Sequence, residues 1–96
     1  MKTLQDIKNA LNRYKPELLE RYPIKSLAIF GSFARNEQTD DSDLDLMVEF
    51  NDRIGLRFVD LADEIEDYLG IKVDLVSRKG IKERYFKVIK SELIYV

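Results

Sequence analysis

Apolar residues at the N-terminal end of the chain recur at helical spacing. They predict a first helix from Thr3 to Tyr14, with Thr3 as its N-cap and Asp6 completing a capping box. Pro16 either ends this helix and starts another turn, or lies within one kinked helix that continues to Pro23. The pattern leaves both arrangements open.

Two further amphipathic helices are predicted later in the chain. Residues 56–69 form a strongly periodic stretch, and Gly70 is placed to end it. We expect its apolar stripe to comprise Phe58, Ala62, Ile65 and Leu69, widened by Val59, Leu61 and Tyr68. Its charged face should meet water through Arg57, Asp60, Asp63, Glu64 and Asp67. Residues 81–91 predict a last helix, with an inward face of Tyr85, Phe86 and Ile89.

Three strands are predicted between these helices, at residues 25–30, 43–50 and 71–76. The first is apolar on both faces, whereas the other two alternate between apolar residues and aspartates. We expect a short helix at residues 33–36, and either a strand or a docking tail at residues 93–96. The pattern predicts one α/β (α+β) domain over residues 1–96, with a small mixed sheet of three to four strands flanked by helices.

The composition restricts the chemistry that the chain can perform. It contains no cysteine and no histidine, so thiolate chemistry, a cysteine-based zinc site and a histidine general base are excluded. A metal would have to be held by oxygen ligands, which favours Mg²⁺, Mn²⁺ or Ca²⁺. The spacing of the acidic residues does not match an EF-hand loop.

The net charge of −2 hides an uneven distribution. Residues 36–70 carry two basic and twelve acidic residues, whereas each flanking segment carries seven basic and three acidic residues. A nucleotide site needs this mixture of carboxylates for cations and basic groups for phosphates. Nucleic acid is not expected as the main partner, because its binding surface would be basic throughout. No long apolar run suggests a membrane span or signal peptide, so we expect a cytoplasmic protein.

Three strand aspartates are the strongest chemical signal in the sequence. Asp43 and Asp45 are two residues apart on a predicted strand, so their carboxylates share one face, about 6–7 Å apart between Cα atoms. Asp74 follows on the next strand. These residues could simply lie on a solvated face. Like charges about 6.5 Å apart cost roughly 2–3 kcal/mol at an effective dielectric of about 20, which a divalent cation would reverse, so we favour metal binding.

Gly31-Ser32 lies between the buried first strand and the predicted short helix. Glycine permits a sharp turn and a close approach by a ligand. The N–H groups at the start of a helix attract anions, so this junction is a candidate phosphate site. A Gly-Ser pair alone is weak evidence, and its position about a dozen residues before the aspartates gives it weight.

Gly31-Ser32-Phe33-Ala34-Arg35, followed by Ser42-Asp43-Leu44-Asp45-Leu46, resembles the signature of the DNA polymerase β-type nucleotidyltransferase superfamily. The short chain is similar to the minimal nucleotidyltransferase (MNT) antitoxins of HEPN/MNT toxin–antitoxin pairs. One departure is Asn36, where the family usually has glycine. Asparagine tolerates a left-handed backbone best among the other residues, so we expect the turn to survive.

The resemblance implies a mechanism of nucleotidyl transfer. Asp43, Asp45 and Asp74 would hold two Mg²⁺ ions, with Mn²⁺ as an alternative, and Asp74 would deprotonate or orient the attacking hydroxyl. Gly31 and Ser32 would hold the phosphates of ATP. Arg35 would either reach a phosphate or pair with an acidic neighbour, and the sequence leaves this open. For the basic residues near the C-terminus we expect a solvated helix face, although Arg78 and Lys79 could approach a nucleotide or partner.

The resemblance also implies a partner. By this analogy the acceptor of AMP is a HEPN ribonuclease toxin encoded nearby, which AMPylation silences. The chain leaves no room for a second substrate domain, which also favours a macromolecular acceptor. Two alternatives stay open: an antitoxin that masks its partner without catalysis, and transfer to a small molecule or RNA. The sequence does not decide between a monomer and a homo-oligomer.

Overall fold

The computed structural model describes residues 2–96 and contains a four-stranded sheet. The strands are β1 (Ile24–Phe30), β2 (Leu44–Phe50), β3 (Val73–Ser77) and β4 (Ile94–Tyr95), in the spatial order β3-β2-β1-β4. β1 pairs antiparallel with both β2 and β4, whereas β2 pairs parallel with β3. The predicted mixed sheet is therefore confirmed, with the C-terminal residues as its fourth strand.

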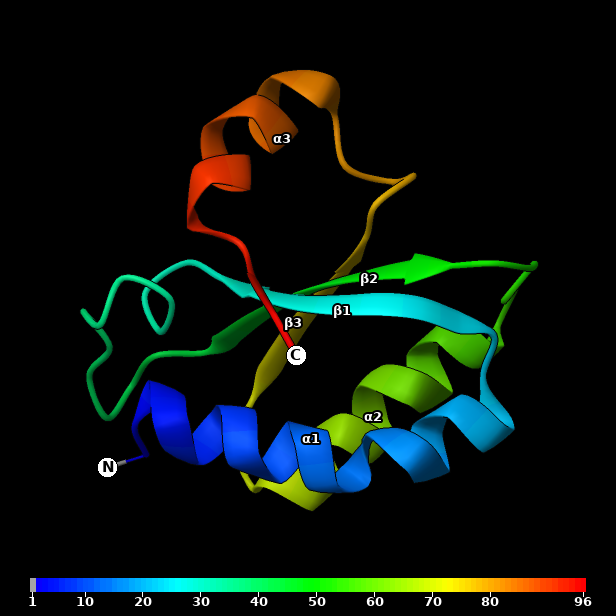
Figure 1. Cartoon of the computed structure of the whole chain (residues 1–96), viewed down its shortest axis with the longest axis horizontal. Coiled ribbons are helices and arrows are strands. Elements are labelled where there is room, and N and C mark those ends of the chain that lie inside the picture. Colours follow the sequence, from blue (N-terminus) through cyan, green and yellow to red (C-terminus); the bar gives the residue numbers. More distant parts are fainter. Residues whose placement is uncertain (1) are drawn as a thin grey trace.

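The helices occupy both sides of this sheet. They are α1 (Leu4–Arg21), α2 (Arg57–Leu69), α3 (Glu83–Ile89) and the 3₁₀ turn η1 (Lys90–Glu92). Figure 1 shows α1 and α2 together on one side and α3 on the other. Within the described part of the chain, none of them is both long and apolar enough to cross a membrane.

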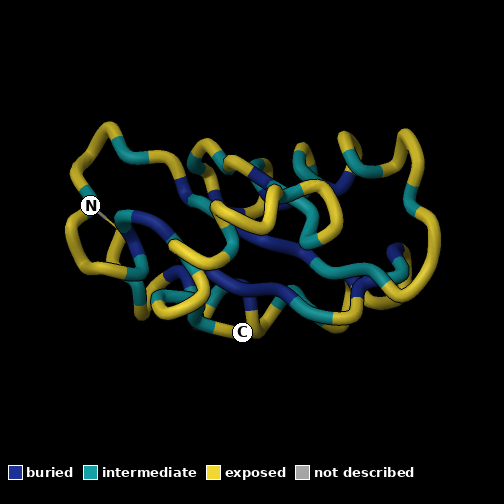
Figure 2. Tube along the Cα trace, turned by 90° about the horizontal axis from the view of Figure 1, so that it is seen from above, coloured by how far each residue is buried: buried dark blue, intermediate teal, exposed yellow. Residues whose placement is uncertain are grey.

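The core lies between the sheet and the α1–α2 pair. Its fully buried members include Ile7 and Leu11 of α1, Leu27 of β1, Leu46 of β2 and Ile65 of α2. In Figure 2 the central strands are dark blue, whereas the connecting loops and the outer helix faces are exposed. One face of β2 therefore points into the core, and alternation sends Asp45 to the opposite face.

α1 is a single helix that contains Pro16. The capping box predicted at Thr3 and Asp6 is present. Leu11 and Leu18, on either side of the proline, are both buried in the same core. This burial holds both halves in place, although proline cannot donate the hydrogen bond that a helix needs at its position. The sequence pattern alone did not show whether this packing would outweigh the effect of the proline.

Glu64 of α2 corrects one prediction, because its side chain is only 21% exposed and is held by groups of α1 and its C-cap. Its carboxylate accepts hydrogen bonds from the hydroxyls of Tyr14, at 2.6 Å, and Tyr22, at 3.0 Å, and pairs with Arg21. The rings of Tyr14 and Tyr68 stack beside this cluster, with centroids 4.0 Å apart. Polar contacts therefore join α1 to α2 around a residue whose position on the helix predicted exposure.

The C-terminal helix is shorter and less buried than predicted. α3 covers Glu83–Ile89 and continues as η1, in place of one helix over residues 81–91. Tyr85, predicted to point inward, is 56% exposed, and Val88 is 72% exposed, while Phe86 and Ile89 are partly buried. The helix lies apart from the α1–α2 side of the core, so only part of its apolar surface is covered (Figure 1).

Other local details also differ from the predictions. β2 begins at Leu44, so Asp43 lies just before the strand, and β3 begins at Val73 where residue 71 was predicted. Residues 33–36 form a hydrogen-bonded turn and do not form a helix. On α2, Val59 and Tyr68 are exposed, whereas Leu61, Ile65 and Leu69 are buried.

Candidate active site

The pairing of β2 with β3 brings two of the three predicted aspartates together. Asp45 and Asp74 are partners in the parallel register, about 4.8 Å apart across the sheet. Leu44, Leu46 and Leu75 point into the core, so both aspartates project from the opposite face. Asp74 is exposed and Asp45 is half-buried. Two carboxylates thus share one open face of the sheet.

Gly31 completes this part of the site from the neighbouring strand. Phe30, the last residue of β1, pairs with Asp45, and Gly31 follows it with φ at +76°. A Cβ atom at position 31 would lie 2.9 Å from Cγ of Asp45. Both the backbone conformation and the lack of space therefore require glycine here. The turn brings its backbone directly beside the Asp45 carboxylate.

The electrostatics of Asp45 follow from this crowding. Its pKa is raised from 3.8 to about 6, first because burial disfavours the charged carboxylate, and then because Asp74 and Asp43 are nearby. Arg35 acts in the opposite direction, and Glu92 adds to the negative surroundings. Negative charge thus accumulates at this point of the sheet, where a cation would be favoured.

Asp43 lies at the entrance to β2 and is exposed. Ser42 braces the preceding loop, because its hydroxyl accepts the N–H of Thr39 at 2.9 Å. Asp43 is near enough to raise the pKa of Asp45, so it belongs to the same acidic group. Its position before the strand leaves its side chain less constrained than that of Asp45.

The turn after β1 is closed by its own backbone. The N–H of Arg35 donates to the carbonyl of Gly31 at 3.1 Å, and the N–H of Glu37 donates to the carbonyl of Ser32 at 2.8 Å. Asn36 has φ at +60°, the left-handed conformation expected for the residue that replaces the family's glycine. Ser32 is partly buried at the start of this turn. The predicted phosphate-binding stretch is therefore a tight, ordered turn.

Arg35 extends from this turn into a set of ion pairs. Its Nε donates to Glu37 Oε1 at 2.8 Å, and its Nη1 donates to Glu92 Oε2 at 3.0 Å. Glu92 also accepts the backbone N–H of Gly31, at 3.0 Å. Glu92 is not among the predicted site residues, and it is 61 residues from Gly31 along the chain. No local pattern marks it, and only the docking of the C-terminal segment brings it here.

The donor set at this face fits a divalent metal. All candidate ligands are carboxylate oxygens, which Mg²⁺ and Mn²⁺ prefer. Among residues 2–96, no three acidic side chains already surround one point where an ion could be chelated. Mg²⁺ is commonly held by one or two carboxylates together with substrate phosphates. The adjacent Asp45 and Asp74 satisfy that requirement, with Asp43 at the margin.

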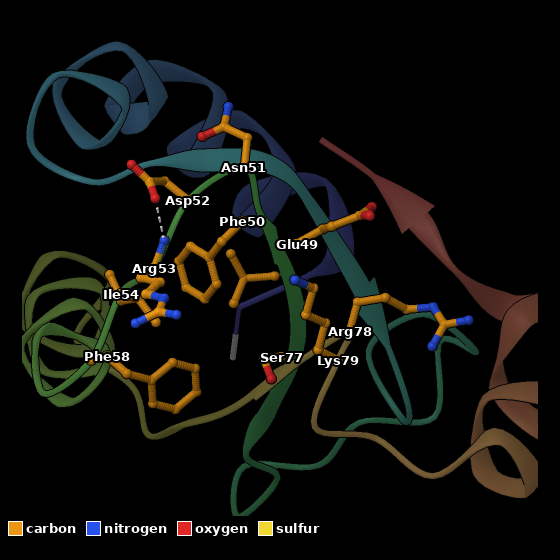
Figure 3. Close-up of a pocket in the computed structure, with 12 residues that line it drawn as sticks. Glu49, Phe50, Asn51, Asp52, Arg53, Ile54, Phe58, Ser77, Arg78 and Lys79 are labelled. Carbon is orange, nitrogen blue, oxygen red and sulfur yellow. Dashed lines mark hydrogen bonds between the residues drawn. The ribbon is translucent and has the colours of Figure 1, made fainter.

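A groove lies elsewhere, at the other end of β2 and β3. This groove of about 750 Å³ is lined by residues that include Phe50, Phe58 and Lys79. In Figure 3, Phe50 and Phe58 lie within it, whereas Arg78 extends away. Arg78 stacks on Phe86 at 3.6 Å and pairs with Glu83 at 3.1 Å. Asp74 lies near the start of β3, whereas Arg78 and Lys79 follow its other end. The structure therefore places both basic residues away from the aspartates.

The glycine turn beside paired strand carboxylates, on a mixed sheet, is the arrangement expected for a nucleotidyltransferase. The nucleotidyltransferase domain family matches residues 11–96. The chain therefore belongs to the nucleotidyltransferase domain family, and it is an enzyme of that kind. This confirms the family that the motifs predicted.

Several relatives match over the whole chain, and two of them serve as examples. A candidate protein adenylyltransferase of Methanocaldococcus jannaschii, MJ0128, is 52% identical over 98 residues, covering 100% of both chains. The protein adenylyltransferase MntA of Thermococcus cleftensis is 37% identical over 97 residues, covering 100% of this chain and 98% of the other. Both of these relatives are named protein adenylyltransferases, and both align with the full length of this chain.

Solved structures agree with the fold. The structure of a candidate minimal nucleotidyltransferase superposes with a TM-score of 0.82 at 32% identity, covering 97% of this chain and 95% of the other. An MNT antitoxin in complex with a tri-AMPylated HEPN toxin of Shewanella oneidensis superposes with a TM-score of 0.70 at 19% identity, covering 93% and 70%. At that identity the second likeness concerns the fold alone.

Proposed function

We propose that this nucleotidyltransferase transfers AMP from ATP to a hydroxyl group of a partner protein. The observation that carries the proposal is the pairing of Asp45 and Asp74 on one open sheet face, directly beside the Gly31 turn. Full-length relatives that are named protein adenylyltransferases support a protein acceptor.

In this proposal each part of the site has a separate task. Gly31 and Ser32 hold the β- and γ-phosphates through backbone N–H groups and a hydroxyl, and Arg35 contributes positive charge. Asp43, Asp45 and Asp74 would hold two divalent ions, Mg²⁺ or Mn²⁺. When bound, these ions neutralise the triphosphate and stabilise charge at the α-phosphate.

The reaction exchanges one bond at the α-phosphorus. The acceptor hydroxyl oxygen bonds to that phosphorus as the bond to the β-phosphate oxygen breaks, and pyrophosphate leaves. Asp74 takes or orients the hydroxyl proton, since it is the exposed member of the pair and the chain has no histidine. Burial raises the pKa of Asp45, and its carboxylate remains beside Gly31.

The proposed partner is a HEPN ribonuclease toxin encoded nearby, and the protein would act in the cytoplasm as its antitoxin. The structural neighbour bound to an AMPylated HEPN toxin supports this choice by analogy of fold. The exposed apolar side chains of Tyr85 and Val88 on α3 offer a surface that a protein partner would cover.

Intact-mass spectrometry of a co-expressed neighbouring HEPN protein tests this function. We expect mass increases in AMP-sized steps with the wild type and none with Asp43→Asn. Asp41→Asn, two residues earlier in the exposed loop, is the matched control and should retain the modification. An unmodified partner in the presence of wild-type enzyme, ATP and Mg²⁺ would contradict the proposal.

A masking antitoxin is the second candidate, and the same exposed surface on α3 favours it. In that case Asp43→Asn with Asp45→Asn would still neutralise the toxin in cells at matched expression. A stable complex without added mass, observed by size-exclusion chromatography, would support masking over catalysis.

A further inference from the structure

A carboxylate of this chain already occupies the turn where a phosphate would bind. Glu92 Oε1 accepts the N–H of Gly31 at 3.0 Å and Nη1 of Arg35 at 3.2 Å, and Oε2 accepts the same Nη1 at 3.0 Å. Both oxygens therefore use groups of the proposed phosphate site. The Glu92 side chain is only 20% exposed, so its carboxylate is partly buried in the turn.

These contacts are the ones that a phosphate oxygen makes. A backbone N–H and a guanidinium are charge-assisted donors that recognise carboxylates and phosphates alike. One carboxylate and one phosphate cannot accept the same Gly31 N–H at the same time. Occupation by Glu92 and occupation by a nucleotide phosphate are therefore alternatives.

The fold delivers Glu92 to this place through the C-terminal segment. η1 ends at Glu92, and Ile94 of β4 then pairs with Ile29, two residues before Gly31. The N–H of Val96 donates to the carbonyl of Leu27 at 3.0 Å, and Lys15 Nζ donates to the carbonyl of Val96 at 2.8 Å. Contacts to both β1 and α1 thus hold the tail that positions this carboxylate.

We propose that Glu92 is a built-in competitor for the nucleotide phosphate, and that it must leave Gly31 and Arg35 before ATP binds. This inference rests on the proposed function, since it assigns Gly31 and Arg35 to the phosphates. Glu92 thereby sets the affinity for the nucleotide. If it holds the turn about nine-tenths of the time, the apparent affinity is about tenfold below that of the open turn.

The test compares Glu92→Gln with a matched variant at the other carboxylate that binds Arg35. Glu37 pairs with Nε of Arg35 but has no contact with the Gly31 N–H among its hydrogen bonds, so Glu37→Gln removes an ion pair without vacating the turn. Titration calorimetry measures the Kd of the ATP analogue AMP-PNP with Mg²⁺ for wild type and both variants. Thermal unfolding without nucleotide checks that each variant is folded, and Glu92→Asp, with its shorter reach, replaces Glu92→Gln if it is not.

Competition predicts a Kd for Glu92→Gln that is roughly five- to tenfold lower than that of the wild type. Glu37→Gln should change it by less than about twofold, as expected for an exposed ion pair. Equal tightening in both variants would overturn the proposal, because freeing the charge of Arg35 would then suffice. Weaker binding by Glu92→Gln would also overturn it, and would make Glu92 a residue that positions Arg35. Absence of binding by all three proteins would instead contradict the proposed function itself.

Discussion

At the scale of single residues, Gly31 and Asp45 depend on one another. Gly31 adopts a left-handed conformation, and its missing side chain leaves the space that the Asp45 carboxylate fills. Asp45 in turn lies beside Asp74 in the sheet, with Asp43 nearby. Like charges opposite one another destabilise a sheet, so this arrangement lowers the stability of the free protein, and a bound cation would offset that cost.

The raised pKa of Asp45 gives a pH-dependent prediction. Its folded pKa of about 6 lies above the ordinary value of 3.8, so the folded state binds more protons between these values. The contribution of Asp45 to stability therefore falls as pH rises from 4 to 7. In EDTA at pH 7.5, we expect Asp45→Asn to have a higher free energy of unfolding than the wild type, because it removes a carboxylate charge that the folded state disfavours. The difference should be about 1 kcal/mol, because solvent screens a half-exposed charge.

Urea unfolding at pH 4.5 and 7.5 measures this difference. The gap between Asp45→Asn and wild type should shrink at pH 4.5, where the folded protein holds Asp45 largely protonated. Asp63→Asn on α2, which is exposed and outside the site, controls for the loss of a carboxylate. A gap of the same size at both pH values would contradict the assignment to Asp45.

At the scale of elements, polar contacts supplement the apolar core. α1 and α2 share buried leucines and isoleucines, and Glu64 joins them at the surface through two tyrosine hydroxyls and Arg21. Backbone hydrogen bonds hold the turn after β1, and the hydroxyl of Ser42 braces the loop before β2. These two segments carry site residues. Rigid strands thus place Asp45 and Asp74, while turns place Gly31 and Asp43.

Glu64→Gln tests the joint between the two helices. We expect it to lower the free energy of unfolding by about 1–2 kcal/mol, since it removes the charge that accepts three donors. The neighbouring exposed Asp63→Asn should change it by less than about 0.5 kcal/mol. Urea unfolding with an unchanged m-value measures both, and equal effects would show that the Glu64 cluster contributes nothing specific.

At the scale of the whole molecule, the C-terminal segment packs against elements from the first third of the chain. β4 covers the free edge of β1, and Lys15 of α1 binds the carbonyl of Val96. The same segment carries Glu92 to the Gly31 turn. Protection of the sheet edge and occupation of the candidate phosphate site are therefore properties of one short tail.

Deletion of residues 93–96 tests what this tail contributes to the fold. We expect the free energy of unfolding to fall by about 1–3 kcal/mol, because hydrogen bonds and apolar contacts to β1 are lost. The exposed edge of β1 should also promote self-association, seen as earlier elution in size-exclusion chromatography. Lys15→Met, which removes only the contact to Val96, should lower stability less and leave the elution volume unchanged.

The sequence alone predicted the family and most of the helices and strands. Alternation along β2 separated Asp45 from its apolar neighbours, because alternation is a local consequence of backbone geometry. For the same reason the periodicity of α2 identified Leu61, Ile65 and Leu69 as buried, although Val59 and Tyr68 of the predicted stripe are exposed. Gly31-Ser32 and the aspartates also indicated the family, which the comparisons confirm. The roles of Asp43, Asp45, Asp74, Gly31, Ser32 and Arg35 in the reaction remain predictions.

Only the tertiary structure decided how distant parts of the chain meet. The continuity of α1 through Pro16, the partial burial of Glu64 between two helices and the exposure of Tyr85 each depend on packing against residues far away in sequence. The meeting of Glu92 with Gly31 and Arg35 depends on the pairing of β4 with β1. A local pattern cannot encode such contacts, because the position of a side chain at one end of the chain is fixed by the sheet that all the strands form together.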